Sequence, residues 1–528
     1  MTSRRRFLGL AAGAGAGLGI PLGAAAYQVR SGESTGTVLK SAISPPARFK
    51  EPLPIPLRAR PTRTSGGTEY YDITQREAAV EILPGTKTTV WGYEGTFPGP
   101  TFVDRSGRKT VVRLQNKLSV PTSMHLHGGV TPSVSDGYPT DLLLPAQCGA
   151  RYKWHQPTHG MHGGMHGSQA AWHVTEGYKT YEYPLDQRAA TLWYHDHRMD
   201  FSAPQVWRGL AGLFLVHDDE EEALPLPDGD KDIPLLICDR SFEADGSFRY
   251  PGHSPSCTGT PGVQDAYMDG VLGDVQLVNG APWPELEVSA THYRLRLLNA
   301  SNARRYRFAL RREHGGGLPF VQIGSDGGLL AAPQTLPAIT AAPAERFDVV
   351  VDFSDVPVGS HATLVNTLAD GRMGEVMRFR VARKEKSAES AGRVPARLSQ
   401  YAPLSPSASV ATRQFDFRRA EDTWTINGRP FNTSEFLARP RLGTVERWRF
   451  TSDFHHPVHL HLAHFQVLSR GGKAPDAVDA GWKDTVDVRP YEVVEVLVRF
   501  QGYRGQYMLH CHNLEHEDMA MMANFEVV

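Results

Sequence analysis

The stretch Val-Glu-Arg-Trp-Arg-Phe at residues 445–450 alternates apolar and charged side chains, and after a turn it continues as Val-His-Leu-His at residues 458–461. Alternation with a period of two is the pattern of a β-strand that buries one face. The same unit of strand, turn and strand occurs twice more, at residues 111–116 with 124–127 and at residues 293–299 with 306–310. A unit repeated three times predicts three copies of one β-rich fold.

Length and composition agree with a β-protein of several domains. The chain has 528 residues, whereas one hydrophobic core usually serves about 100–200. Glycine (51 residues) and proline (38) are frequent, as in chains with many short strands joined by turns. We predict an all-β fold of three tandem β-sandwich domains over residues 50–220, 231–385 and 410–528, with linkers at 218–222 and 384–410.

The N-terminal segment has the features of a twin-arginine signal peptide. An arginine pair within residues 3–8 precedes an apolar stretch rich in glycine and alanine, and the alanines at 24–26 offer a cleavage site. We expect residues 1–26 to direct export to the periplasm or the extracellular space; the alternative is an uncleaved N-terminal anchor. Because this route exports folded proteins, often with cofactors already inserted, it favours a metalloprotein.

Charge and hydropathy exclude two classes of partner. The net charge is −1 and no long basic run occurs outside the N-terminus, which argues against binding to nucleic acid. No segment after the signal is long and apolar enough to cross a bilayer, so stable membrane insertion is not expected.

Four cysteines occur, at positions 148, 238, 257 and 511. Export would permit disulfides, and Cys238 with Cys257 is a candidate pair. Sequence spacing leaves the connectivity of Cys148, Cys238 and Cys257 open.

Four His-x-His pairs are the strongest chemical signal in the chain. Residues i and i+2 of a strand point to the same face, so each pair presents two imidazoles side by side. Two pairs fall in the first predicted domain and two in the third, while the second has Arg307-Phe308-Ala309 at the matching place. One such pair would be an ordinary surface or core feature, but eight imidazoles from two domains suit a polynuclear copper cluster in their interface. The pairs are His125 and His127, His195 and His197, His459 and His461, and His510 and His512.

The C-terminal segment predicts a second copper site. Cys511, His516 and Met521 have the Cys-x4-His-x4-Met spacing of a blue-copper site, and His456 can supply a second imidazole. The alternative for Cys511 is a buried free thiol or half of a disulfide, which its place between two histidines disfavours. Cys511 points to one face of its strand and its histidine neighbours to the other. One peptide would therefore join the two sites as a short path for electrons.

Together these motifs resemble those of the three-domain multicopper oxidases, over nearly all of the chain after the signal. The shared motifs are His-x-His-Gly, Trp-Tyr-His-Asp-His, His-Pro-x-His-x-His and His-Cys-His-x3-His-x4-Met. Residues 125–132, 135–139 and 516–518 are most similar to the branch of spore-coat laccases, bilirubin oxidases and phenoxazinone synthases. The resemblance implies cupredoxin-like Greek-key sandwiches that bind four copper ions: one type 1, one type 2 and two type 3.

The resemblance also implies a role for each ligand. The type 2 copper would be held by His125 and His459. The type 3 pair would be held by His127, His195, His197, His461, His510 and His512. The type 1 copper would be held by His456, Cys511 and His516, with Met521 axial. The motif register favours His456 over His455, and Met521 over Met519 and Met522.

Two acidic residues are candidates for proton transfer. Reduction of O2 to water consumes protons, which a buried cluster receives through acidic side chains. Glu517 follows a type 1 ligand and Asp136 follows the first His pair, and the resembling branch holds acids at the matching positions. We predict proton-relay roles for both; the alternative is that they hydrogen-bond to ligand imidazoles and orient them.

An insert rich in histidine and methionine, from His155 to His166, departs from the branch pattern, and His173 follows shortly after it. Soft thioether and imidazole ligands would suit Cu(I) or Cu(II). The alternative is a solvated loop whose histidines and methionines have no role.

The leading hypothesis for function is a laccase-type enzyme that oxidises phenols, aminophenols or bilirubin-like pigments and reduces O2 to water. A second hypothesis is a Cu(I) or Mn(II) oxidase that serves metal tolerance. A third is a non-catalytic cupredoxin scaffold, which the full set of ligands disfavours. Since domains 1 and 3 supply every ligand, one chain is sufficient for the active site.

Overall fold

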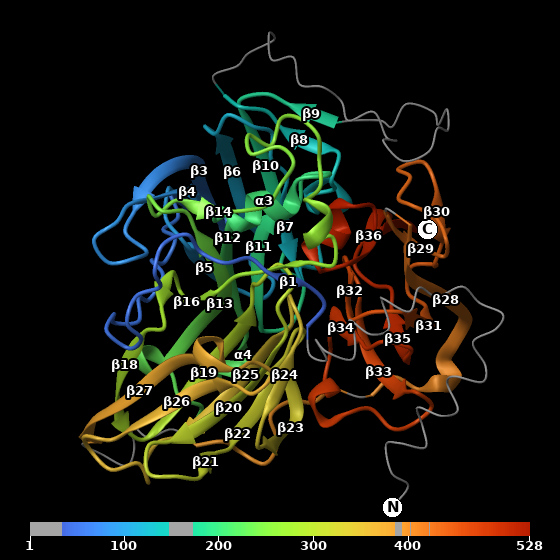
Figure 1. The fold of residues 1–528 in the computed structure, drawn as a ribbon. Coiled ribbons are helices and arrows are strands. Elements are labelled where there is room, and N and C mark those ends of the chain that lie inside the picture. The colour runs from blue at the N-terminus through green and yellow to red at the C-terminus, as the bar shows by residue number, and fades with distance from the viewer. Residues whose placement is uncertain (1–33, 147–172, 386–392, 402, 422) are drawn as a thin grey trace, which may run out of the picture.

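The structure is a computed structural model, and it describes residues 34–146, 173–385, 393–401, 403–421 and 423–528. Strands dominate the described residues, and the predicted all-β class is confirmed. Three pairs of sheets follow one another along the chain, in blue-green, green-yellow and orange-red (Figure 1). The signal segment 1–26 and the His155–His166 insert lie outside the described residues.

Domain 1 is a sandwich of two sheets. One has the order β10-β6-β3-β2 with β4 beside β3, and the other β5-β12-β11-β7. Their strands are β2 (Arg63–Ser65), β3 (Thr68–Val80), β4 (Thr88–Tyr93), β5 (Gly99–Arg105), β6 (Thr110–Asn116), β7 (Met124–His127), β10 (Tyr178–Tyr183), β11 (Ala190–Asp196) and β12 (Ala211–His217).

Domain 2 repeats this plan. One sheet has the order β17-β16-β13-β19-β25-β22-β23 with β14 on β13, and the other β18-β27-β26-β20-β21 with β24 on β20. Their strands are β13 (Asp232–Phe242), β14 (Phe248–Arg249), β16 (Val275–Val278), β17 (Ala281–Pro282), β18 (Glu285–Ala290), β19 (His292–Asn299), β20 (Tyr306–Arg312), β21 (Gly317–Leu318), β22 (Phe320–Ser325), β23 (Gly328–Leu336), β24 (Ile339–Ala341), β25 (Arg346–Asp352), β26 (His361–Asn366) and β27 (Glu375–Lys384).

Domain 3 has the sheets β29-β28-β31-β35-β33 and β30-β37-β36-β32-β34. Their strands are β28 (Ser409–Ala420), β29 (Thr423–Ile426), β30 (Phe436–Ala438), β31 (Val445–Ser452), β32 (His456–Leu460), β33 (His464–Arg470), β34 (Thr485–Val488), β35 (Val493–Arg499), β36 (Gly505–Cys511) and β37 (Met522–Val527).

Short elements join the sandwiches. Two small sheets pair β1 (Thr37–Val38) with β15 (Val271–Leu272) and β8 (Asp141–Leu143) with β9 (His173–Thr175). The α-helices of the described residues are α3 (Ser202–Trp207), α4 (Asp219–Glu222) and α5 (Leu514–Asp518). Single 3-10 turns are η1 (Ser133–Ser135), η3 (Gly229–Lys231), η4 (Asp265–Tyr267), η5 (Gly371–Gly374), η7 (Pro406–Ala408) and η8 (Ala477–Asp479).

The three repeats of the sequence correspond to matching strands. The first strand of each repeat pairs in parallel with an earlier strand: β6 with β3, β19 with β13, and β31 with β28. The strands β7, β20 and β32 occupy matching positions in the other sheet, beside β11, β26 and β36. Domain 2 therefore has the same strand as its neighbours but carries Arg307-Phe308-Ala309 where they carry histidines. The sheets span 63–217, 232–384 and 409–527; the domain limits 50–220, 231–385 and 410–528 stay predictions.

The candidate disulfide between Cys238 and Cys257 is not formed, and both thiols are free and buried. The reason is that the two cysteines pack into different cores. Cys238 lies on β13 in a cluster with Trp283 and Leu298, whereas Cys257 packs with the core of domain 1. Cys148 lies outside the described residues.

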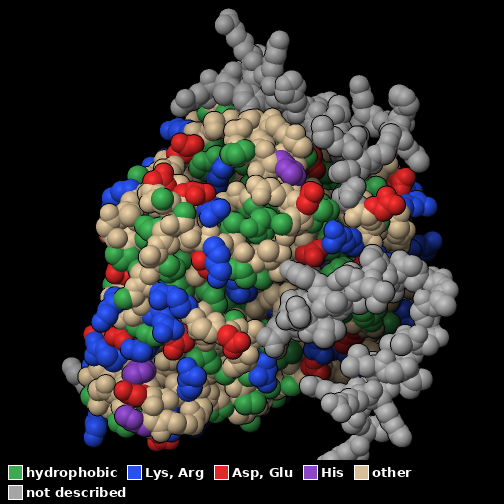
Figure 2. All heavy atoms as spheres, viewed as in Figure 1, with side chains coloured by type: hydrophobic (Ala, Val, Ile, Leu, Met, Phe, Trp, Pro, Cys, Tyr) green, Lys and Arg blue, Asp and Glu red, His purple; other side chains and the backbone are tan. Residues whose placement is uncertain are grey.

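The surface mixes both charges. On the face drawn in Figure 2, lysine and arginine alternate with aspartate and glutamate, and neither sign dominates. Among the described residues, no helix has the length and apolar character needed to span a membrane.

Candidate metal centres

The four His-x-His pairs lie at the interface of domains 1 and 3, where β7 and β11 lie close to β32 and β36 (Figure 1). Strand register places one histidine of each pair opposite a histidine of another: His125 faces His195 across β7 and β11, and His459 faces His510 across β32 and β36. All eight rings are at most 1% exposed. The alternation of the strands thus turns eight imidazoles into one buried site.

The ring nitrogens of the eight histidines form three groups, here called the histidine cluster. In the first group, Nε2 of His125 lies 3.4 Å from Nε2 of His459. In the second, Nε2 of His510 lies 3.3 Å from that of His197 and 3.2 Å from that of His461. The third contains the Nε2 atoms of His195 and His512, 3.4 Å apart; His127 lies within ligand distance of His195 and also of His125.

Carbonyl oxygens fix the orientation of several rings. Nδ1 of His125 lies 2.6 Å from the carbonyl of Asp136, Nδ1 of His459 2.9 Å from that of Asp484, and Nδ1 of His195 2.9 Å from that of Asp196. A carbonyl only accepts, so Nδ1 donates and the lone pair of Nε2 faces the cluster. The donor set therefore fits metal ions that prefer imidazole, such as copper.

His127 has the opposite orientation. Its Nε2 lies 3.0 Å from Oδ1 of Asp484, and its Nδ1 is buried with no hydrogen-bond partner among the described residues. A carboxylate accepts the proton of Nε2, which leaves Nδ1 as the ligand atom.

Burial favours the uncharged form of several of these rings. Burial, reinforced by neighbouring imidazoles, lowers the pKa of His125, His461 and His512 well below the usual 6.5. Neutral imidazoles repel one another less than imidazolium ions and offer lone pairs to a metal.

A second group lies on the other face of β36. Sγ of Cys511 is 3.4 Å from Nδ1 of His456 and 3.6 Å from Nδ1 of His516, and these two nitrogens are 3.2 Å apart. Burial raises the pKa of the Cys511 thiol well above its usual value, so a bound cation would be needed to hold it as a thiolate. The group fits a trigonal copper site with two imidazoles and one thiolate.

Met521 is fixed beside this group by the backbone. The N–H of Cys511 donates to the carbonyl of Met521 at 3.1 Å, and the N–H of Met521 donates to the carbonyl of His516 at 3.0 Å. Met521 is buried in the same core as Cys511, whereas Met522 packs with a separate cluster around Met508.

His455 does not join the group. Its Nε2 lies 3.4 Å from Nη1 of Arg305 and its Nδ1 3.5 Å from Oδ1 of Asp487. His456, which the motif register favours, is the histidine of the two that lies beside Cys511.

Both predicted acids touch the histidine cluster. Oδ2 of Asp136 lies 2.7 Å from Nδ1 of His461. Oε2 of Glu517 lies 3.1 Å from Nδ1 of His510, and its Oε1 3.6 Å from Nδ1 of His197. Burial alone would raise the pKa of Glu517, but His197 and His510 lower it to about 2. These contacts suit the orienting role and leave the relay role as a proposal.

Sequence reasoning missed several residues of the site. Asp484 and Arg346 support His127, and they are too far apart in the chain to form a motif. Trp424 stacks on His516 with ring centroids 3.7 Å apart. Asp453 lies 3.1 Å from Nε2 of His456, and its position three residues before His456 is the signal that would have revealed it.

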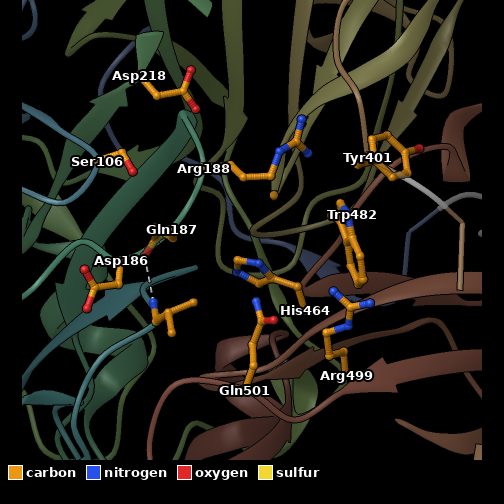
Figure 3. Close-up of a pocket in the computed structure, with 12 residues that line it drawn as sticks. Ser106, Asp186, Gln187, Arg188, Asp218, Tyr401, His464, Trp482, Arg499 and Gln501 are labelled. Atoms are coloured by element: carbon orange, nitrogen blue, oxygen red, sulfur yellow. Dashed lines mark hydrogen bonds between the residues drawn. The ribbon is translucent and has the colours of Figure 1, made fainter. Parts of the chain in front are cut away.

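A cavity of about 510 Å³ lies where the three domains meet. Gln187 and Asp186 of domain 1 lie opposite His464 and Trp482 of domain 3 (Figure 3). Both Gln187 and His464 donate to the carbonyl of Gly128, the residue after His127, at 3.1 and 3.0 Å. The wall of the cavity therefore adjoins the histidine cluster.

An all-β chain whose buried histidines and one cysteine gather in this way defines a copper oxidase with cupredoxin-like domains. Models of the multicopper oxidase family match residues 74–157, 153–221 and 402–528. The chain is 34% identical to the laccase of Bacillus subtilis (strain 168), over 91% of this chain and 98% of that protein. It is 35% identical to the bilirubin oxidase of Albifimbria verrucaria, over 93% of this chain and 84% of that protein.

Solved structures agree with the sequence relatives. The crystal structure of a multi-copper oxidase from Pediococcus acidilactici matches with a TM-score of 0.77 at 30% identity, and the match covers 93% of each chain. The chain therefore belongs to the multicopper oxidase family and is a laccase-like oxidase, as the sequence motifs predict.

Proposed function

We propose that this chain oxidises phenolic, aminophenolic or bilirubin-like donors one electron at a time and passes the electrons to O2, with four bound copper ions as cofactors. Copper bound in these two sites would accept single electrons from the donor and reduce O2 to water. The observation that carries the proposal is the position of Cys511, whose thiol joins one site while its neighbours His510 and His512 belong to the other. The names of the laccase and bilirubin oxidase relatives support the donor class.

The ligand assignment follows the three nitrogen groups. His125 and His459 would hold the type 2 copper, as the contact between their Nε2 atoms supports. The type 3 pair would be held by His197, His461 and His510 on one side and by His127, His195 and His512 on the other. The type 1 copper would be held by His456, Cys511 and His516, with Met521 axial.

Electrons would enter through the outer edge of His456. Oδ1 of Asp453, a residue with a 16% exposed side chain, lies 3.1 Å from Nε2 of His456, and its Oδ2 accepts the N–H of Arg419 at 2.8 Å. Asp269, nearby, pairs with the Arg419 guanidinium at 2.7 Å. Both carboxylates, of Asp453 and Asp269, already accept hydrogen bonds from protein groups. This edge therefore suits a metal cation, which needs several free carboxylates, less well than an organic substrate that forms one hydrogen bond to a carboxylate.

Proton delivery to the cluster is assigned to Glu517 and Asp136. Both carboxylates are buried against cluster imidazoles, within reach of a proton moving toward the site. The variant E517Q keeps the shape and loses the acid. We expect slower O2 reduction at full copper content; an unchanged rate at full copper content would reject the relay.

Two further proposals concern segments outside the described residues. Residues 1–26 would direct twin-arginine export to the periplasm or outside the cell, and the His155–His166 insert would bind Cu(I). Deletion of residues 155–167 tests the second idea: unchanged Cu(I) oxidation and copper tolerance would reject it. Since both sites draw on one chain, a monomer would be sufficient for activity.

A steady-state O2-uptake panel tests the proposed function. Copper-loaded protein is assayed with a phenol, an aminophenol, bilirubin and Cu(I), with C511S as a control that should lose uptake with every donor. Uptake with the organic donors supports the proposal. Uptake driven only by Cu(I) would indicate a metal oxidase, and a colourless protein without uptake would indicate a non-catalytic scaffold.

A further inference from the structure

Arg346 is a fully buried arginine at which the three domains meet. It begins β25 of domain 2, and its Nε donates to the carbonyl of Thr191 in domain 1 at 3.0 Å. Within its own domain, Nη1 donates to Ala344 at 2.9 Å and Nη2 to the carbonyl of Asp326 at 3.2 Å. The remaining donors form a fork on the carboxylate of Asp484 in domain 3, with Nη1 2.7 Å from Oδ1 and Nη2 bonded to Oδ2.

Asp484 carries this contact to the histidine cluster. The oxygen that Nη1 binds, Oδ1, also lies 3.0 Å from Nε2 of His127 and accepts the Thr485 hydroxyl at 2.9 Å. The backbone carbonyl of Asp484 faces Nδ1 of His459 at 2.9 Å. One residue therefore orients a ligand from domain 1 and a ligand from domain 3.

The packing leaves little freedom for this arrangement. Gly128 follows His127 with φ +85°, and a Cβ there would lie 2.6 Å from Nη2 of Arg346 and 2.8 Å from Oδ2 of Asp484. The arginine–carboxylate pair thus presses directly on the backbone that holds His127. A bidentate fork fixes the plane of a carboxylate, which a single ammonium group cannot do.

We infer that Arg346 is a positioning residue of the histidine cluster. By fixing the Asp484 carboxylate, it holds the proton of His127 on Nε2 and presents Nδ1 to the metal. Domain 2, which lacks ligands of its own, thereby contributes to the metal site. This inference rests on the proposed function, because it takes the cluster to be a copper site.

The test compares R346M and R346K with R304M. Arg304 is a matched control: it is buried in domain 2 and pairs with the buried Asp239 at 2.8 Å, but it touches Asp239 and Gly273 rather than a cluster ligand or Asp484. Copper affinity is measured by competition with a chelator. For each variant we would also record the copper content, the near-ultraviolet absorption of the proposed type 3 copper pair, the blue absorption of the Cys511 site and the unfolding of the apo-protein.

We expect R346M to weaken copper binding in the histidine cluster by about 10- to 100-fold, because loss of a residue that orients a ligand has effects of this size. The blue absorption should persist, since Arg346 does not contact His456, Cys511 or His516. R346K should be intermediate, because the charge remains and the fork is lost. R304M should match wild type in copper affinity even where it lowers stability.

Wild-type copper affinity and near-ultraviolet absorption in R346M would overturn the inference and leave Arg346 a purely structural residue. Should R346M fail to fold, R346K and D484N decide by the same measurements. If wild-type protein itself binds no copper, the proposed function fails, and that outcome is distinct from a normal wild type with a normal R346M.

Discussion

Glu221 on α4 closes an ion network between domains 1 and 2, and its removal gives a prediction with a defined pH dependence. The carboxylate is 4% exposed. Oε1 lies 2.5 Å from Nη2 of Arg294 and 3.2 Å from Nη2 of Arg296, and Oε2 lies 2.6 Å from Nδ1 of His217. Burial would raise the pKa of Glu221, but His217 and the two arginines lower it far below 4.5.

The variant E221Q keeps the volume of the side chain and removes its charge. Loss of one partner from a buried ion pair costs about 3–5 kcal/mol. Here we expect about 3 kcal/mol, the low end, because Asp232 and Asp348 still face the two arginines. At about 1.4 kcal/mol per factor of ten, the ratio of folded to unfolded protein falls about 100-fold at pH 7.

The sign of the pH effect follows from the lowered pKa. A carboxylate whose pKa is lower in the folded state stabilises the protein fully above its unfolded value of 4.5, and this contribution fades as the pH falls below 4.5 toward the folded value. Urea unfolding at pH 7 should therefore separate wild type from E221Q, and the gap should narrow below pH 4.5.

The neighbouring variant E222Q is the matched control. Glu222 pairs with Arg105 at the exposed surface, where ion pairs contribute little, so no measurable change is expected. A gap between wild type and E221Q that is absent at pH 7, or that stays constant through acid pH, would refute the network.

Three further predictions concern the sites. D453N should lower kcat/KM for a phenolic donor about tenfold, because a hydrogen bond to a charged group is worth about 1.5–3 kcal/mol. The KM for O2 should not change, since this hydrogen bond lies at the proposed electron-entry edge. Equal effects on both substrates would contradict the prediction. G128A should destabilise the protein and weaken copper retention. The control G107A should retain copper normally, because Gly107 has a similar φ of +72° but open space around it. Equal copper loss in both variants would count against the close packing at Gly128. Cys238 and Cys257 should react with a thiol reagent only after denaturation, and a peptide map showing a bridge between them would disprove the two separate cores.

Much of the site is predictable from local sequence because strand alternation is a local property. A His-x-His pair on a strand has both imidazoles on one face whatever the rest of the fold does, and the spacing from Cys511 to His516 and Met521 follows one strand and one short helix. The repeated strands likewise predict the β-class and the sandwich plan.

The supporting residues are not predictable in this way. Arg346 and Asp484 meet only because β25 of domain 2 and the segment before β34 of domain 3 pack together, and neither position carries a motif. Cys238 and Cys257 are close in sequence, yet they point into separate cores. Such contacts depend on how domains pack, which local patterns do not encode.

Copper content of purified wild-type protein and of C511S, measured after identical copper loading, tests most directly whether the two sites hold copper as proposed. The proposed ligand assignment predicts four copper ions per chain and a blue colour in wild type. It predicts three ions, no blue absorption and an intact near-ultraviolet band in C511S. A wild type that binds no more than one copper, or a C511S variant that stays blue, would contradict the account.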